Sequence, residues 1–427
     1  MDVLKKIETP GAVTGTMLFA FVVGIAFHSC LLGAHVASAT WLAILVEELF
    51  LLLVVPAKRL RILLLILAAC LFGVWRFDVA PTPKLRWING IPSEIRIDAE
   101  GEPFTTLKTW RVAVTERIGS AIPPDEATLV AGMLYGDEDL SKSQKAAFRT
   151  AGLMHLVAVS GSNVTIVIAF VVLIAHALHL RRRHAFVANS LALLGFVCFV
   201  GLSASVLRAA CMGWLLLLAR ELGYLSRSRR LLLCAAVILL LIDPWQLAFD
   251  AGFALSFLAM IGLLFWTPIF ERGLWFVPKR LGLRSILSAT CGATLMTVPY
   301  SAWVFQQLTL AGLFTNILAL PLVPFVMLWG AVAAVWGSFV YAQIVAAPAY
   351  GLALTIEKIA DLAYATPWLE ATHVQMVFPL CAATYLLIGT LWWKLKDGKK
   401  LSTSRDERAH ISVSFDPTVS VGQQRIE

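Results

Sequence analysis

Apolar stretches long enough to cross a bilayer recur along this chain of 427 residues. A transmembrane helix needs roughly 17–25 apolar residues, and hydrophobic residues make up 59% of the chain. Charged residues make up only 15%, against about a quarter in soluble proteins. The sequence therefore predicts an all-α polytopic membrane protein with about 10–12 transmembrane or partly inserted helices, including interrupted and amphipathic interfacial helices. The candidate stretches are 12–33, 41–55, 61–76, 153–180, 186–202, 205–219, 231–242, 252–270, 286–305, 309–328, 329–347 and 375–393.

The Lys and Arg residues indicate how the chain is threaded through the membrane. Cytoplasmic loops of membrane proteins carry an excess of these cations. Placing all clusters of cations on one side predicts a multi-pass protein of the cytoplasmic (inner) membrane, with both termini in the cytoplasm. The clusters are Lys5/Lys6, Lys58/Arg59/Arg61, Arg181 to Arg183, Arg227/Arg229/Arg230, Lys279/Arg280/Arg284 and Lys394/Lys396.

Composition and charge divide the chain into four predicted regions. They are an N-terminal transmembrane hairpin region over 1–76, an external loop over 77–151, a helical core over 152–394 and a disordered cytoplasmic tail over 395–427. Within the loop, Glu94 to Ala99 alternates polar and apolar residues like a short strand. Apolar residues recur at helical spacing from Leu107 to Ile118, which predicts an amphipathic helix on the membrane surface. We expect the stretch 349–366, which carries charges, to lie along the interface.

Capping signals mark two further helices in the external loop. The run PPD at 123–125 would open one helix, and Gly136 would close it. Ser141 and Gln144 have the spacing of a capping box, in which each residue bonds the backbone of the other. They predict a helix that ends near Gly152.

The stretch GLMHLVAVSGSNVTIV, over 152–167, places polar residues inside an apolar segment. Polar groups are costly in hydrocarbon unless they line a cavity or pair with neighbouring helices, so His155, Ser160, Gly161 and Asn163 are predicted to form a site. A serine hydrolase would need a base beside Ser160. His155 lies five residues before it, which speaks against direct pairing. The HExxH pattern of zinc proteases is absent from the sequence.

Further polar residues in the apolar core form a second pattern. Arg208 would either snorkel to the interface or face a polar path, and Asp250 would either cap its helix or belong to a site. Asn316 precedes Pro321, which predicts a bent or interrupted helix. On the predicted threading these groups converge on the outer half of the membrane, which favours a polar vestibule. The polar residues are Arg208, Asp250, Ser256 and Asn316, and Phe253 and Pro321 lie near them in the sequence.

Several sequence blocks are similar to those of one known family. GLMHLVAVSGSNV resembles the signature of the ComEC competence proteins, the polytopic channels of bacterial DNA uptake. Four more blocks resemble that family in the same order, at Met133–Gly152, Ser205–Met212, Asp243–Leu264 and Val298–Val323.

This chain also departs from the pattern of that family. Asn163 stands where many relatives carry His, and Asn cannot titrate near neutrality. The loop 77–151 looks too short for a complete external oligonucleotide-binding-type domain. Nothing after residue 395 would form the metallo-β-lactamase-like domain in which full-length relatives often end. The chain resembles the membrane core of the family alone.

The resemblance implies a membrane channel that moves single-stranded DNA across the cytoplasmic membrane during natural transformation. It implies neither enzymatic activity nor a cofactor or metal. Trp110, Arg111 and Arg117 would guide the strand along the external surface, and Arg208 would meet phosphates at the mouth of the conduit. The residues expected to line or shape the conduit are His155, Ser160, Gly161, Asn163, Arg208, Asp250, Phe253, Ser256, Asn316 and Pro321.

The implied partners are single-stranded DNA, a separate DNA receptor, a cytoplasmic helicase-type ATPase, a detached nuclease and membrane lipid. No P-loop is visible in the sequence, so a separate ATPase would supply the energy. Two alternatives stay open. One is a transporter of a small or amphiphilic anion that uses the same polar residues, and the other is an intramembrane serine hydrolase.

Overall fold

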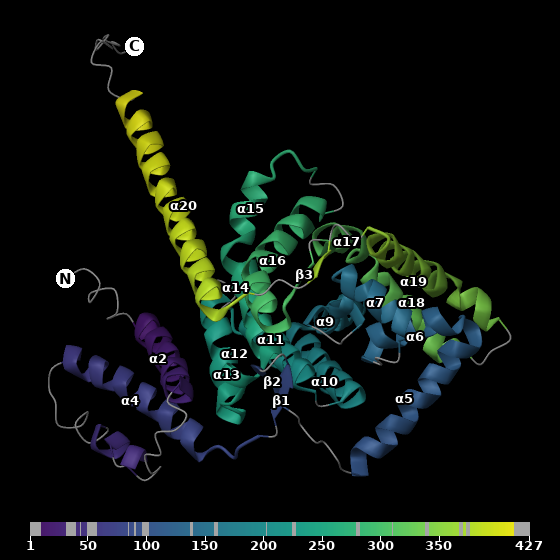
Figure 1. The fold of residues 1–427 in the computed structure, drawn as a ribbon, viewed down its shortest axis with the longest axis horizontal. Coiled ribbons are helices and arrows are strands. Elements are labelled where there is room, and N and C mark those ends of the chain that lie inside the picture. Colours follow the sequence, from purple (N-terminus) through teal and green to yellow (C-terminus); the bar gives the residue numbers. More distant parts are fainter. Residues whose placement is uncertain are drawn as a thin grey trace, which may run out of the picture. The chain divides into compact units, whose positions relative to one another are not determined.

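The computed structural model describes the chain outside residues 1–9, 31–39, 43, 49–57, 84, 89–90, 96–101, 137–139, 158–160, 202, 224–227, 279–281, 310, 338–340, 367–369, 373–375 and 414–427. The chain divides into two units, Met1–Val374 and Gln375–Glu427. Helices make up most of both (Figure 1). The helices of the first unit are α2 (Pro10–Cys30), α4 (Lys58–Val79), α5 (Glu102–Ala121), α6 (Pro124–Tyr135), α7 (Lys142–Thr150), α8 (Met154–Val157), α9 (Gly161–Ala177), α10 (Arg182–Val200), α11 (Ala204–Glu221), α12 (Ser228–Ile242), α13 (Gln246–Phe249), α14 (Ala251–Phe265), α15 (Thr267–Gly273), α16 (Leu283–Phe305), α17 (Ala311–Ala319), α18 (Val323–Trp336) and α19 (Ala342–Tyr364).

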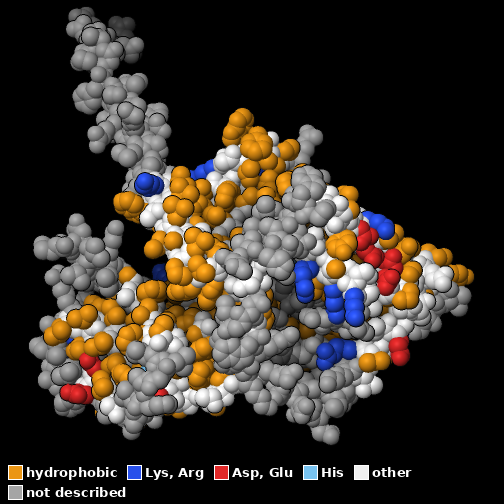
Figure 2. Space-filling view, viewed as in Figure 1, with side chains coloured by type: hydrophobic (Ala, Val, Ile, Leu, Met, Phe, Trp, Pro, Cys, Tyr) orange, Lys and Arg blue, Asp and Glu red, His pale blue; other side chains and the backbone are white. Residues whose placement is uncertain are grey.

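Long apolar helices confirm the predicted all-α membrane architecture. Among the described residues, four helices are long and apolar enough to span a bilayer, and up to six spans result if each of two bent helix pairs counts as one. The larger number predicted from the sequence includes shorter apolar helices such as Asn163–Ala177. Hydrophobic side chains are exposed over much of the surface seen in Figure 2, as expected of helices that face lipid. The four are Ala12–Cys30, Leu60–Val79, Arg182–Val200 and Phe378–Leu395.

The interrupted helix predicted at Pro321 is present. Helix α17 ends at Ala319 and α18 begins at Val323, and the two helices are bent by 52°. Pro321 lies between them, and Pro324 follows in the first turn of α18. Proline has no backbone N–H to donate, which favours a bend or break of the helix in this segment. Helices α14 and α15 form a second bent pair, at 48°.

Two small antiparallel two-stranded sheets accompany the helices. Strand β1 (Leu85–Ile88) pairs with β2 (Ile91–Ile95), and β3 (Gln307–Thr309) pairs with β4 (Glu370–Thr372). The sequence predicted one strand over 94–99. The observed strand begins earlier, at Ile91, because the alternating polar and apolar residues belong to a strand that pairs with β1. Residues 96–101 lie outside the described part of the chain.

The caps predicted within residues 77–151 are confirmed. Gly136 closes α6 in a left-handed conformation with φ 78°, and its N–H donates to the Gly132 carbonyl oxygen at 2.8 Å. Both halves of the capping box at Ser141 and Gln144 are present. Helix α7 ends at Thr150, close to the predicted end.

Two helices expected to lie along the membrane surface or interface bury one side in the protein. On α5, Ile118 is fully buried and Val114 packs against the same core. Most of the segment 349–366 belongs to α19, which ends at Tyr364 and buries Ala349 and Ile356 in that core. The amphipathic patterns were read correctly as helices, but protein neighbours such as α18 cover their apolar sides. The cluster's further α19 members are Ala346, Ala353, Ala360 and Ala363.

The second unit consists of α20, which runs from Phe378 to Val413. The sequence predicted a disordered tail from residue 395. That prediction is wrong up to residue 413, because the helix continues through the polar sequence. Residues 414–427 lie outside the described part of the chain.

The contact between α14 and α16 depends on two glycines. A Cβ at Gly262 would overlap the carbonyl oxygen of Gly292, and a Cβ at Gly292 would lie 2.9 Å from the oxygen of Gly262. Small residues let the backbones of membrane helices approach closely. This contact therefore fixes the distance between the two helices.

Gly262→Ala is expected to lower the free energy of unfolding by about 1–3 kcal/mol, because the added methyl must push two backbones apart. Gly195→Ala on α10 is the matched control, since a Cβ there meets nothing within 4 Å. It is expected to stabilise the helix by about 0.5–1 kcal/mol. Unfolding of the purified protein in detergent measures both, and equal effects of the two substitutions would contradict the close approach.

Candidate functional site

The turn that leads into the polar stretch is held by α17. Gly152 has a left-handed φ of 68°, which glycine adopts without strain. The Thr315 hydroxyl donates a hydrogen bond to the Ala151 carbonyl oxygen at 2.7 Å. A Cβ at Gly312 would lie 3.6 Å from the Gly152 Cα. The interrupted helix and the start of the polar stretch therefore form one packed unit.

Asn163 joins α9 to the end of α6. Its side chain is fully buried, and its Nδ2 donates to the Met133 carbonyl oxygen at 2.9 Å. The last carbonyls of a helix lack partners within the helix, and Met133 lies in the last turn of α6. The Asn163 amide therefore satisfies a buried carbonyl that apolar surroundings would leave unpaired.

Arg208 and Asp250 form a buried ion pair between α11 and the start of α14. Arg208 Nη1 lies 2.6 Å from Asp250 Oδ2, and their side chains are 5% and 6% exposed. Asp250 Oδ1 also accepts a hydrogen bond from the Phe253 N–H at 3.1 Å, so Asp250 caps α14 as well. A Cβ at Gly252 would lie 2.6 Å from Arg208 Nη2, so the glycine makes room for the guanidinium.

This pair decides between the alternative interpretations of both residues. Arg208 does not snorkel, because its side chain is buried and neutralised by Asp250. Asp250 is both a cap and an ion-pair partner. Arg208 Nε is buried with no hydrogen-bond partner among the described residues. A buried charge in this position is stable only while its partner is present.

The two polar contacts lie on neighbouring helices. Val164 on α9 and Ala209 on α11, which follow Asn163 and Arg208 in sequence, belong to one buried cluster. A Cβ at Gly213 would lie 3.1 Å from the Val164 side chain, so α9 and α11 approach closely.

An open cavity of about 430 Å³ runs along α9 from this region. Thr165 lines one end, His176 and Arg220 line the other, and the apolar residues Ile168, Ala169, Val172 and Leu173 lie between them. Thr165 is exposed and lies one turn beyond Gly161, whose carbonyl oxygen its hydroxyl bonds at 2.8 Å. The face of α9 that begins at the polar stretch is therefore accessible.

The other predicted core residues have varied surroundings. His155 is exposed on α8, and its Nδ1 lies 3.0 Å from the Gly152 carbonyl oxygen. Gly161 begins α9, and Ser160 lies outside the described residues. The remaining residues lie on the bent helices. Phe253 is buried and stacks on Phe257, and the Ser256 hydroxyl donates to the Gly252 carbonyl oxygen at 2.7 Å. Asn316 has a buried Oδ1 without a partner among the described residues.

The three predicted guiding residues on α5 differ in what they can do. Trp110 is 65% exposed and Arg117 is exposed. Arg111 Nη1 instead donates to the Val200 carbonyl oxygen at 3.0 Å, at the C-terminal end of α10. Arginines favour helix C-termini because they bond the last carbonyls and complement the helix dipole. Arg111 therefore has a structural contact that its sequence position did not indicate.

The sequence alone did not indicate the partners of the polar side chains. The Met133 carbonyl, Gly252 and Thr315 complete the contacts of Asn163, Arg208 and the Gly152 turn. Only Gly252 carried a signal, because it lies two residues from Asp250 in the sequence. Among the described residues, no group of three or more His, Cys, Asp or Glu side chains is arranged to hold a metal ion.

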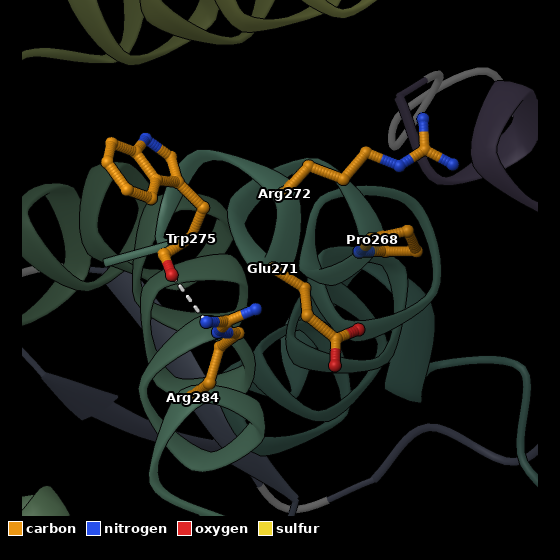
Figure 3. Close-up of a pocket in the computed structure, with 5 residues that line it drawn as sticks. All are labelled: Pro268, Glu271, Arg272, Trp275 and Arg284. Atoms are coloured by element: carbon orange, nitrogen blue, oxygen red, sulfur yellow. Dashed lines mark hydrogen bonds between the residues drawn. The ribbon is translucent and has the colours of Figure 1, made fainter. Parts of the chain in front are cut away.

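A second open cavity, of about 450 Å³, lies where α15 leads into α16 (Figure 3). Arg284 donates to the Trp275 carbonyl oxygen and, at 2.8 Å, to that of Val277, so it holds this connection together. None of the predicted site residues lines this cavity.

The carboxyl group of Glu357 on α19 lies against the start of α6 and α7. Burial raises its pKa, and the neighbouring carboxylates of Glu126, Asp361 and Asp125 raise it further. The Gln144 amide, which donates to Glu357 Oε1 at 3.2 Å, acts in the opposite direction. A carboxyl whose pKa is higher in the folded than in the unfolded chain stabilises the fold at acid pH, and this contribution is lost as pH rises through the raised value.

Glu357→Gln is therefore expected to stabilise the protein at pH 8 and to flatten the fall in stability between pH 5 and pH 8. The amide keeps an oxygen that accepts from Gln144 and removes the charge. Thermal unfolding across this pH range measures the effect, with Glu271→Gln on α15 as an exposed control. An unchanged pH profile in Glu357→Gln would show that the carboxyl does not titrate in this range.

Comparison of the sequence with known proteins places this chain in a family. The family described as "Competence protein" matches residues 133–397, which is more than half of the 427 residues. The chain belongs to the competence-protein family. The match begins at Met133, the residue that Asn163 contacts, and covers all predicted core residues. Trp110, Arg111 and Arg117 precede it.

This competence-family chain is similar to two curated bacterial proteins. It is 32% identical to ComE operon protein 3 of Bacillus subtilis (strain 168) over 253 residues, which are 59% of this chain and 32% of that protein. It is 28% identical to the uncharacterized protein YcaI of Escherichia coli (strain K12) over 244 residues, which are 53% of this chain and 31% of that protein. The chain thus spans about a third of the length of the curated relatives it matches. No solved structure matches it.

Proposed function

We propose that this chain forms a channel that moves single-stranded DNA across the cytoplasmic membrane during natural transformation. Its membership of the competence-protein family supports the proposal. The observation that carries it is the set of buried polar contacts on α9, α11 and α14 inside an otherwise apolar bundle. Polar groups at membrane depth are costly and usually mark a path or a site.

A DNA strand must be shielded from lipid, because it carries a charge on every nucleotide. Channels conduct when contacts to the permeating ion are favourable but weak. The exposed face of α9 next to Thr165 supplies an accessible surface, while Asn163 and the Arg208–Asp250 pair fix the helices behind it. We assign these buried residues to shaping the conduit, because their polar atoms already bond protein groups.

The proposed orientation follows the distribution of cations in the sequence. Both termini lie in the cytoplasm, and the loop 77–151 lies outside, where it first meets DNA. Arg117 and Trp110 are exposed on this loop and can contact phosphates and bases, the two groups that single-strand binding proteins use. A DNA receptor, a helicase-type ATPase and a nuclease would act as separate chains, and membrane lipid would surround the helices. The chain itself acts without catalysis.

Uptake of labelled DNA tests the proposal. Cells that lack the gene are expected to bind DNA at their surface but to accumulate none in the cytoplasm, and the wild-type gene is expected to restore uptake. Cytoplasmic accumulation in the deletion strain would contradict the proposal and favour an anion transporter. Normal DNA transport by Ser160→Ala would exclude an intramembrane serine hydrolase, because a hydrolase would lose its activity with this substitution.

A further inference from the structure

Helix α7 carries three cations along one side. Lys142, Lys145 and Arg149 follow each other at intervals of three and four residues, and residues at these intervals share one face of a helix. Lys142 and Arg149 are exposed, and Lys145 is half-buried. Figure 2 shows Lys and Arg side chains gathered in the part of the molecule where Figure 1 places α7. We call these three residues the α7 stripe.

The α7 stripe has no ionic partner in the part of the chain that the structure describes. Acidic residues lie close by: the Gln144 amide donates to Glu357 Oε1 and to the backbone carbonyl oxygen of Asp125, each at 3.2 Å. None of their carboxylates comes within ion-pair distance of the stripe. Among the described residues, its charges are therefore not neutralised by an ion pair.

The three cations do not stabilise α7 itself, so helix stability does not explain why they are there. Lys142 lies in the first turn of the helix, where the helix dipole disfavours a cation. Like charges three or four residues apart repel each other, and α7 contains no acidic residue that would offset them. The helix is instead fixed by its capping box and by Phe148, which is fully buried.

Anchoring to lipid does not account for them either. A helix that lies on a membrane needs an exposed apolar face beside its cations. The apolar residues Ala147 and Phe148 of α7 are buried in the main core of the protein. On the proposed orientation the helix also lies outside the cell, where the positive-inside rule expects few clustered cations.

We propose that the α7 stripe binds the phosphates of single-stranded DNA before the strand passes into the conduit. The inference rests on the proposed function and adds a binding site to it. Seven residues of helix extend about 10 Å, enough to contact more than one phosphate. Helix α7 leads through the Gly152 turn into the polar stretch, so bound DNA lies next to the conduit. The carboxylates of Asp125 and Asp361, both exposed nearby, repel phosphates and confine the strand to the other side.

The salt dependence of DNA binding tests this site. Full-length protein in nanodiscs of uncharged lipid is titrated with a fluorescent oligothymidylate across a range of salt concentrations. Each phosphate contact with a single strand contributes a slope of about −0.7 to the plot of log affinity against log salt. Replacing all three cations of the α7 stripe by Gln is expected to flatten the slope by about 2 and to weaken binding on the order of 100-fold at about 0.1 M salt.

Two controls keep the result specific. Lys142→Arg with Lys145→Arg keeps the charges and is expected to bind like the wild type. Gln at Arg181, Arg183 and Arg272, which are exposed on α10 and α15 or beside them, removes the same charge and is expected to keep the slope.

The outcomes separate the site from the function. A Gln variant of the α7 stripe that binds with the wild-type slope would overturn the site and leave the channel proposal standing. A wild-type protein that shows no salt-dependent binding of single strands would overturn both. Loss of binding to anionic-lipid vesicles with unchanged DNA binding would assign the α7 stripe to the membrane and also overturn the site.

Discussion

Arg208→Met and Asp250→Asn are each expected to lower the free energy of unfolding by about 3–5 kcal/mol, and the double variant is expected to recover most of this loss. Each single change leaves one buried charge without its partner, which is 2.6 Å away in the native protein. The double variant has no charge to leave unpaired. In Asp250→Asn the amide oxygen can still accept a hydrogen bond from the Phe253 N–H, so the cap of α14 is retained.

Chemical unfolding in mixed micelles, followed by circular dichroism, measures the four proteins of the cycle. We expect the two changes to be strongly non-additive, because the side chains are in direct contact. Single variants that each cost less than about 1 kcal/mol and add independently would contradict a buried, mutually dependent pair.

DNA uptake by the same variants separates two roles of Arg208. Because its charge is buried and neutralised by Asp250, we expect uptake to follow stability and to recover in the double variant. A stable double variant that transports no DNA would show instead that Arg208 contacts the strand.

Asn163→Asp is the second substitution with a large expected effect. A carboxylate at this position would face the Met133 carbonyl oxygen, which accepts from the Asn163 amide at 2.9 Å in the native protein. Two acceptors would then meet in a fully buried site, at an expected cost of about 3–5 kcal/mol near neutral pH. Asn163→Leu leaves the carbonyl unpaired without adding a charge, and about 1–3 kcal/mol is expected.

The two variants at Asn163 differ in their expected response to pH. A protonated carboxyl group can donate to the carbonyl oxygen and a carboxylate cannot, so the hydrogen bond is present at acid pH and lost as pH rises. Asn163→Asp is therefore expected to be more stable at pH 5 than at pH 8 relative to Asn163→Leu. Thermal unfolding at both values measures this, and equal stability of Asn163→Asp and the wild type at pH 8 would contradict the hydrogen bond.

Local features of this site were predictable from the sequence. The capping box at Ser141 and Gln144, the cap at Asp250 and the bend at Pro321 each depend on residues a few positions apart. Such signals act through short backbone geometry and do not require knowledge of the fold.

The partners of the polar side chains were not predictable in the same way. Asn163 and Met133 are 30 residues apart, and Arg208 and Asp250 are 42 residues apart. Each pairing is decided by how helices pack, which a single sequence does not specify. The same reason explains α5, whose pattern indicated a helix but could not show that Ile118 is covered by protein.

Crosslinking of DNA stalled in transit tests whether the strand passes along α9. A photoreactive amino acid replaces Thr165, on the exposed face of α9 beside the polar stretch, or Leu194, which is 60% exposed on the neighbouring helix α10. Cells take up single strands that carry a bulky group at one end, so that transport begins but is not completed. We expect DNA to crosslink at Thr165 and not at Leu194, because a charged strand passes along the polar stretch and not through lipid. Crosslinking at Thr165 no higher than at Leu194, while stalled DNA is present in the membrane, would contradict a conduit beside α9.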